Sequence, residues 1–196
     1  MKHALILPEG YELVEHMDLQ KNKKLLLLVN GLALIISLLL TIPVLFFVPL
    51  NTLWEKGFWG WSLFLLILKL IVMLAAMVVY LVLHELVHGI CMIAITHTKP
   101  HYGFTGMYAY AGSSAFFGKG AYILVALAPV ILWGGVLAVL SCIVPQGWFW
   151  VVYSVQITNL SGAAGDLYVT CRMLTMPKDI LVQDSGVAMK VYSKKL

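Results

Sequence analysis

At 196 residues the chain has the size of one domain, and its composition is that of a membrane protein, since 61% of its residues are hydrophobic and only 11% are charged. The formal net charge of +4 does not indicate nucleic-acid binding, because most of the Lys and Arg residues flank apolar segments. We therefore expect a lipid bilayer around the chain and no nucleic-acid partner. The three cysteines show no paired spacing, and we expect small buried apolar residues rather than disulfides or ligands: Cys91, Cys142 and Cys171.

Residues 1–24 are polar and acidic, and no cleavage site follows a short apolar core, so we expect a cytoplasmic segment rather than a signal peptide. Its acids are expected to form a solvated face: Glu9, Glu12, Glu15 and Asp18. The first predicted span is Leu25 to Phe47, about 34 Å of helix, which is long enough for a bilayer. We interpret it as a permanent anchor.

The next apolar stretch, from Gly57 to Thr96, is too long for one ordinary span. We divide it near Lys69, with an aromatic entry at the membrane interface over residues 57–69 and a membrane helix over Leu70 to Thr96. A single long tilted helix is the alternative.

The loop from Pro100 to Gly120 alternates aromatic with small or polar residues, which predicts a short hairpin at the membrane surface. Either it binds an extended substrate by strand addition, or its aromatics form an interfacial belt. Spans three and four are expected at Ala121 to Val144, with a kink at Pro129, and at Trp148 to about Leu174.

The predicted fold is therefore an all-α polytopic membrane protein with about four transmembrane helices, the short hairpin or loop, and a small cytoplasmic tail. We treat residues 1–196 as a single membrane-embedded domain, with a membrane core over 25–174 and a tail over 175–196. That tail carries a turn signal between two short apolar segments and predicts a second hairpin.

The basic residues orient the chain. With the N-terminus in the cytoplasm, eleven of the thirteen Lys and Arg lie on the inner side, and only Lys56 lies outside, with Lys69 near the outer interface. We expect both termini in the cytoplasm.

Residues 84–88 read His-Glu-Leu-Val-His within a predicted membrane helix. His84 and His88 project from one helix face at the spacing of two zinc ligands, and Glu85 is placed to act as a general base on water. Ionisable groups in hydrocarbon are costly, and a metal would explain them. The alternative is a packing network in which the three side chains bond to one another.

A catalytic zinc usually takes three protein ligands. The extended metalloprotease pattern needs a histidine where this chain has Ala94, and His97 lies about 13 Å of helix beyond His88. No Asp or Glu occurs between Glu85 and Asp166, so elimination leaves Asp166 as the third ligand. His88 and Asp166 fall about 12 and 9 Å from the inner ends of parallel spans, and they can meet.

Asn159 lies two turns before Asp166 on nearly the same face, beyond a run of small residues at 161–165 that would allow close helix packing. Its amide either orients substrate and donates to a developing oxyanion or forms an interhelical hydrogen bond. Both interpretations stay open at this stage.

These motifs resemble the putative zincin peptidase family of short bacterial membrane proteins, which is related to the intramembrane zinc metalloproteases of the site-2 protease class. The supporting segments are Leu7 to Tyr11, His84 to Gly89, Asn159 to Asp166 and Pro177 to Gly186. The chain departs from the better-known site-2 proteases because it has no proline between Asn159 and the Gly-Asp pair and no PDZ-sized insertion.

The resemblance implies a bacterial cell-membrane protease that hydrolyses peptide bonds of membrane proteins or peptides within or near the bilayer. His84, His88 and Asp166 would bind Zn²⁺, and Glu85 would move the proton. The alternatives are a zinc-binding membrane scaffold or sensor without protease activity and, less well supported, a metal transporter.

Overall fold

The computed structural model describes residues 3–18, 20–106 and 108–194. The chain forms two compact units: the first comprises Met1–Asn30, Val82–Pro129 and Gly165–Leu196, and the second comprises Gly31–Leu81 and Val130–Ala164. Helices α1 (Lys23–Leu45), α2 (Trp59–Thr96) and α3 (Lys119–Ile143) each contribute residues to both units.

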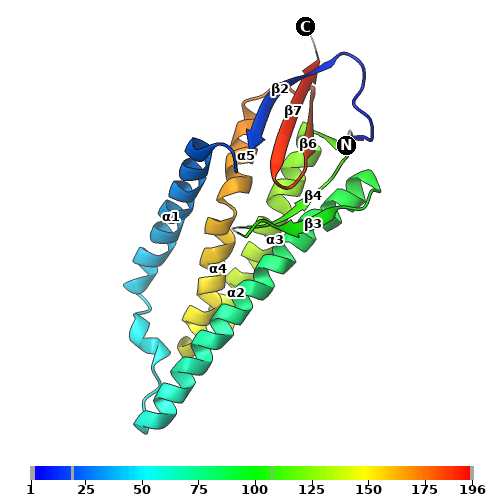
Figure 1. Ribbon diagram of the computed structural model, residues 1–196. Helices are drawn as coiled ribbons and strands as arrows, with labels where there is room; N and C mark the ends of the chain where they lie inside the picture. The colour runs from blue at the N-terminus through cyan, green and yellow to red at the C-terminus, as the bar shows by residue number, and fades with distance from the viewer. Residues whose placement is uncertain (1–2, 19, 107, 195–196) are drawn as a thin grey trace. The chain divides into compact units, whose positions relative to one another are not determined.

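The first unit contains an antiparallel five-stranded sheet with the strand order β1-β5-β6-β7-β2, of which β2, β6 and β7 are labelled in Figure 1. Its inner strands carry β-branched and aromatic residues in register, with Phe117 opposite Val182 and Val182 opposite Val191. A bulge between Leu13 and Glu15 interrupts the pairing of the edge strand β2 with β7. The strands are His3–Ala4 (β1), Tyr11–Asp18 (β2), Phe116–Gly118 (β5), Ile180–Asp184 (β6) and Ala188–Lys194 (β7).

A separate two-stranded sheet is formed by β3 (His101–Phe104) and β4 (Ala109–Gly112) in the same unit. The hairpins expected in the 100–120 loop and in the C-terminal tail are thus confirmed as local structures. The all-α fold class is wrong, because the described chain is a mixed structure of helices with a five-stranded and a two-stranded sheet. The N-terminal segment, whose acids were expected to form a solvated face, supplies two strands of the larger sheet.

The core of the first unit packs the sheet against helices. Its buried side chains include Met92 of α2, Val125 of α3 and Met173 of α5 (Ala164–Leu174), together with Phe117 and Val182 of the sheet. The helices that carry the candidate site therefore share a core with the sheet, so the sheet fixes their local positions.

Three helices are long and apolar enough to cross a membrane, judged by length and composition among the described residues. They are α1 (Lys23–Leu45), α2 (Trp59–Thr96) and α3 (Lys119–Ile143). Asn22 starts α1, since its side-chain oxygen accepts the Leu25 amide at 3.1 Å. The predicted division at Lys69 is wrong, because α2 runs unbroken for 38 residues, as in the single-helix alternative. It ends where His97 turns to a φ of +57°.

The expected fourth span is not one helix. It is divided into α4 (Phe149–Gly162) and α5 (Ala164–Leu174), with Ala163 between them at ψ 13°. Glycine favours this interruption because it is a poor helix former. A Cβ on Gly162 or Gly165 would meet nothing within 4 Å, so these glycines mark the break rather than a close helix contact.

The second unit packs α2 against α3 and α4 through a small apolar cluster that includes Tyr80, Leu137 and Val155. Lys69, expected near the outer interface, is only 1% exposed in this unit. Its ammonium donates to Glu55 at 2.7 Å and to the Leu53 carbonyl at 3.0 Å. These bonds attach the turn after α1 to α2 and compensate the buried charge.

Candidate metal centre

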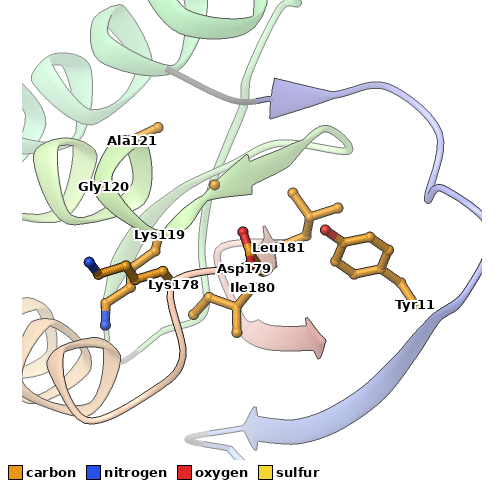
Figure 2. A pocket seen from close by; sticks show the side chains of 9 residues that line it. Tyr11, Lys119, Gly120, Ala121, Lys178, Asp179, Ile180 and Leu181 are labelled. Carbon is orange, nitrogen blue, oxygen red and sulfur yellow. The ribbon is translucent and has the colours of Figure 1, made fainter. Parts of the chain in front are cut away.

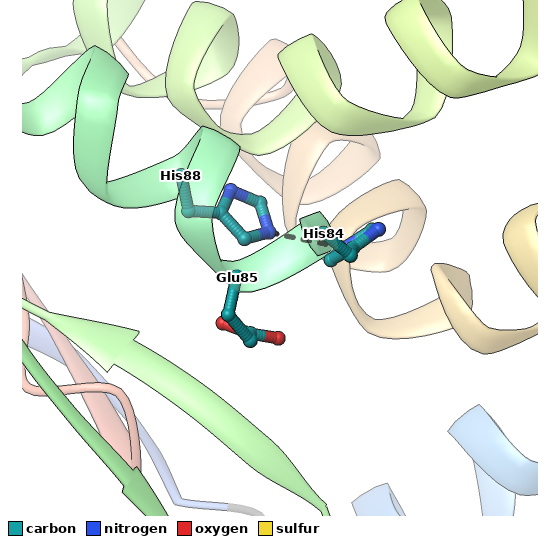
Figure 3. Close-up of side chains that lie close together, drawn as sticks. All are labelled: His84, Glu85 and His88. Atoms are coloured by element: carbon teal, nitrogen blue, oxygen red, sulfur yellow. Dashed lines mark hydrogen bonds between the residues drawn. The ribbon is translucent and has the colours of Figure 1, made fainter. Parts of the chain in front are cut away.

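Two histidines of α2 converge in the first unit. His84 and His88 are four residues apart, and their Nε2 atoms lie 3.2 Å from each other, as the dashed line in Figure 3 marks. Each residue is only 8% exposed. The i,i+4 spacing on a helix places both rings on one face, as the sequence predicts.

Asp166 joins the two histidines. It lies in the first turn of α5, where the helix dipole favours a carboxylate. Asp166 Oδ2 is 3.3 Å from His84 Nε2, and Asp166 Oδ1 is 3.6 Å from His88 Nε2. The carboxylate selected from the sequence by elimination is therefore the one that meets both imidazoles.

The spacing of these donor atoms fits a zinc ion. At zinc–ligand distances of about 2.0–2.1 Å, tetrahedral geometry puts neighbouring donors roughly 3.3 Å apart. The three separations among His84, His88 and Asp166 are 3.2, 3.3 and 3.6 Å. Two imidazoles and one carboxylate form a donor set that catalytic zinc uses, and Asp166 keeps 26% of its side chain exposed, which leaves an approach for a further ligand.

The tautomer of His88 is set by α3. His88 Nδ1 lies 2.9 Å from the carbonyl oxygen of Val125, and since a carbonyl only accepts, Nδ1 carries the proton. Nε2 of the neutral ring is then a lone-pair donor aimed at His84 and Asp166. An outer hydrogen bond of this kind orients a metal-binding imidazole and raises its basicity.

Pro129 explains why the Val125 carbonyl is available. In an α-helix this carbonyl would accept the amide of the residue four positions later, but position 129 is a proline within α3 and has no N–H. The carbonyl is thus free of its helical partner and accepts from His88 instead. The sequence marks Pro129 as a kink; the released carbonyl at position 125 is the functional consequence that was not predicted.

Glu85 lies beside the two histidines (Figure 3). One ligand-capable atom from each of His84, Glu85 and His88 lies within 4.8 Å of the others, so Glu85 is itself a potential ligand. The contacts of Asp166 with the histidines are closer, at 3.3 and 3.6 Å. The Glu85 carboxylate interacts with the backbone amide of Ala111, which holds it against the β3–β4 hairpin.

Asn159 belongs to the second unit, and its amide is engaged there. Tyr80 Oη donates to Asn159 Oδ1 at 2.8 Å, and Asn159 Nδ2 donates to the Val130 carbonyl at 3.3 Å. The side chain is fully buried. These bonds match the interhelical alternative; a substrate role for Asn159 stays a prediction.

Asp184 of β6, a partly buried acid, is hydrogen-bonded to α3. Asp184 accepts a hydrogen bond from the Tyr122 hydroxyl and another from the Gly186 amide at 2.7 Å. Burial raises the pKa of Asp184, and the two hydrogen bonds oppose that rise only in part. Because Tyr122 lies one turn before Val125, this pair fixes the segment of α3 that orients His88.

A cavity of about 230 Å³ lies elsewhere in the first unit, at the start of α3 (Figure 2). Its lining includes Tyr11, Lys119 and Lys178 and none of the five predicted site residues. The Lys119 ammonium already donates to the carbonyls of Leu174 and Met176 at 3.3 and 2.6 Å. The cavity is therefore separate from the candidate metal centre.

Two histidines one helical turn apart, with a glutamate next to the first, form the donor pattern of the zincin class of metallopeptidases. The model of a family described as "Putative zincin peptidase" matches residues 77–181, more than half of the chain, and the chain belongs to this family. Membership assigns the chain to the metallopeptidases and implies zinc as the metal. No curated protein and no solved structure matches the chain.

Proposed function

We propose that the protein is an intramembrane zinc metalloprotease, similar to the site-2 proteases, that hydrolyses peptide bonds of membrane proteins or peptides within or near the bilayer. The convergence of His84, His88 and Asp166 carries this proposal, since the histidines lie on α2, a helix long and apolar enough to span a membrane. The positive-inside distribution supports a cell-membrane location with both termini in the cytoplasm.

Each side chain of the site has a separate role in the proposed reaction. His84 and His88, through Nε2, and Asp166, through its carboxylate, would hold the ion. Zn²⁺ supplies Lewis acidity, which acidifies water and polarises a peptide carbonyl. Glu85 takes the proton of the attacking water on a carboxylate oxygen and gives it to the nitrogen of the leaving amine. The Val125 carbonyl keeps the proton of His88 on Nδ1, so that Nε2 remains a ligand.

The β3–β4 hairpin supports a site for an extended substrate. The amide of Thr105 donates to the Tyr108 carbonyl, and because hydrogen-bonded pairs alternate along an antiparallel ladder, the Ala111 amide points away from β3. That outer edge of β4 faces Glu85. A substrate segment that adds to this edge as a strand would bring its backbone close to the general base.

The second candidate function is a zinc-binding scaffold or sensor without protease activity. The position of Glu85 within 4.8 Å of the two histidines favours the protease, because a structural zinc site needs ligands but no base beside them.

The variant Glu85→Gln separates the two functions. In detergent-solubilised full-length protein, this variant should keep its zinc and lose cleavage of membrane substrates, which it should also retain as trapped partners. Asp179→Asn is the matched control, since Asp179 is an exposed acid outside the site. Cleavage by Glu85→Gln at the wild-type rate would refute the protease mechanism, and a wild type that binds zinc but never cleaves would favour the scaffold.

A further inference from the structure

Tyr102 of β3 packs its phenol end against Gly89 of α2. A Cβ added at Gly89 would overlap the Tyr102 hydroxyl and its ring carbon Cζ, so only glycine allows this approach. Gly89 directly follows His88 and lies four residues after Glu85, on the same stripe of the helix as Glu85. The contact therefore brings a hydroxyl group to the helix turn that carries the candidate base.

The pairing of the hairpin places Tyr102 at the level of Glu85. Tyr102 lies directly opposite Ala111, whose amide interacts with the Glu85 carboxylate. In addition, a Cα–Cβ bond in a helix tilts toward the N-terminus, so the space above Gly89 leans over Glu85. Two independent features, the glycine contact and the strand register, thus put the Tyr102 phenol beside the general base.

The hydroxyl of Tyr102 is available as a donor. The side chain is 49% exposed, and within the described residues its hydroxyl forms no hydrogen bond. Partial burial and, secondly, the charge of Glu85 raise the pKa of Tyr102. The phenol consequently keeps its proton throughout the neutral pH range.

We propose that Tyr102 is a catalytic residue of the peptidase, whose hydroxyl donates a hydrogen bond to the carbonyl oxygen of the scissile peptide as negative charge develops on it. The inference rests on the proposed function. Tyr102 keeps its proton during the reaction, whereas Glu85 alone transfers one. Donors directed at a developing oxyanion act in the transition state and typically contribute about 10²–10³-fold to kcat in a water-poor site.

The test compares Tyr102→Phe with Tyr110→Phe in the full-length zinc-loaded protein. Tyr110 is a matched control from the opposite strand, where its ring packs against Gly103 and Gly186 instead of Gly89. Tyr102→Phe should bind a phosphinic peptide, a tetrahedral mimic of the transition state, at least ~10-fold more weakly than Tyr110→Phe does. Zinc content and KM should not change, and kcat on a peptide trapped with Glu85→Gln should fall about 10²-fold.

The variant Gly89→Ala displaces the hydroxyl without removing it. Because the atom that must move is the far end of a flexible side chain, the protein should fold, lose phosphinic-peptide affinity as Tyr102→Phe does, and show little further loss in the double variant. Equal affinity and kcat in Tyr102→Phe and Tyr110→Phe would refute the role of Tyr102 while leaving the protease intact. A wild type that neither cleaves nor binds the phosphinic peptide would overturn the proposed function together with this inference.

Discussion

Replacing Pro129 with alanine restores an amide that competes with His88 for the Val125 carbonyl. The present bond from His88 Nδ1 is 2.9 Å long and has no helical competitor, since Pro129 has no N–H. Loss of an outer hydrogen bond to a metal-binding histidine costs about 10–100-fold in metal affinity. Because a carbonyl has two lone pairs and competition is partial, we expect the lower end, about 10-fold or ~1.4 kcal/mol.

The stability of the metal-free protein should not fall when the zinc affinity falls. Removing a proline from a helix interior gains about 3 kcal/mol, whereas the loss of two buried methylenes at this site costs about 1.6 kcal/mol. The metal-free variant should therefore unfold no more easily than the wild type, although it binds zinc more weakly. A lower zinc affinity without a lower stability indicates that His88 has lost its orientation, whereas a destabilised fold would lower both.

The assay is zinc competition with a chromophoric chelator on the purified full-length protein, with thermal unfolding of the metal-free form measured in parallel. Pro43→Ala is the control, since Pro43 also lies inside a long apolar helix, α1, and in the second unit. An unchanged zinc affinity in Pro129→Ala, or an equal loss in Pro43→Ala, would show that the Val125 carbonyl does not orient His88 for zinc.

Two further predictions concern the acids. Asp166→Ala should lower zinc affinity by more than ~100-fold, which exceeds the effect of losing an outer hydrogen bond. Asp179→Ala, the control, should leave the affinity unchanged. Retention of zinc by Asp166→Ala in the same competition assay would exclude Asp166 as a ligand. Asp184→Asn tests the partly buried acid of β6. Because the pKa of Asp184 is raised in the folded protein, its protonated form stabilises the fold at low pH. That contribution is lost as pH rises from the unfolded pKa of about 3.9 through the raised pKa. The melting temperature of the wild type should therefore fall relative to that of Asp184→Asn over this interval, and parallel pH profiles would contradict the assignment.

The sequence predicted best those features that follow from composition or from neighbouring residues. Apolar runs predict α1, α2 and α3. The absence of other acids between Glu85 and Asp166, together with the depth of Asp166, indicated that Asp166 meets the histidines, and its carboxylate lies 3.3 and 3.6 Å from them. Local turn signals suffice for the β3–β4 and β6–β7 hairpins, whose strands are neighbours in the chain.

The remaining structure depends on contacts between distant segments. Strand β2 consists mainly of exposed and half-buried residues with several charges, and its pairing with β7, some 170 residues later, is what makes it a strand. Strand β1 likewise depends on its pairing with a distant segment, β5. The break between α4 and α5 was interpreted as a packing surface, since small residues serve either purpose.

Within the site, the sequence predicted that His84 and His88 share one helix face, whereas the contacts that support them were not predicted. Pro129 is visible in the sequence, but only the folded chain shows that His88 is the group that uses the released carbonyl. Tyr102 occurs in an alternating aromatic pattern that two other interpretations explain equally well, and its contact with Gly89 distinguishes it from the other tyrosines of the loop.

The central claim is that two imidazoles of α2 and one carboxylate of α5 hold a zinc ion. X-ray absorption at the zinc edge of the purified full-length protein tests it most directly, combined with the metal content. We expect about one zinc per chain, with two nitrogen ligands near 2.0–2.1 Å, oxygen ligands and no sulfur, and a spectrum that loses one imidazole in His88→Ala. A protein without stoichiometric zinc, or a zinc bound through cysteine sulfur, would contradict it.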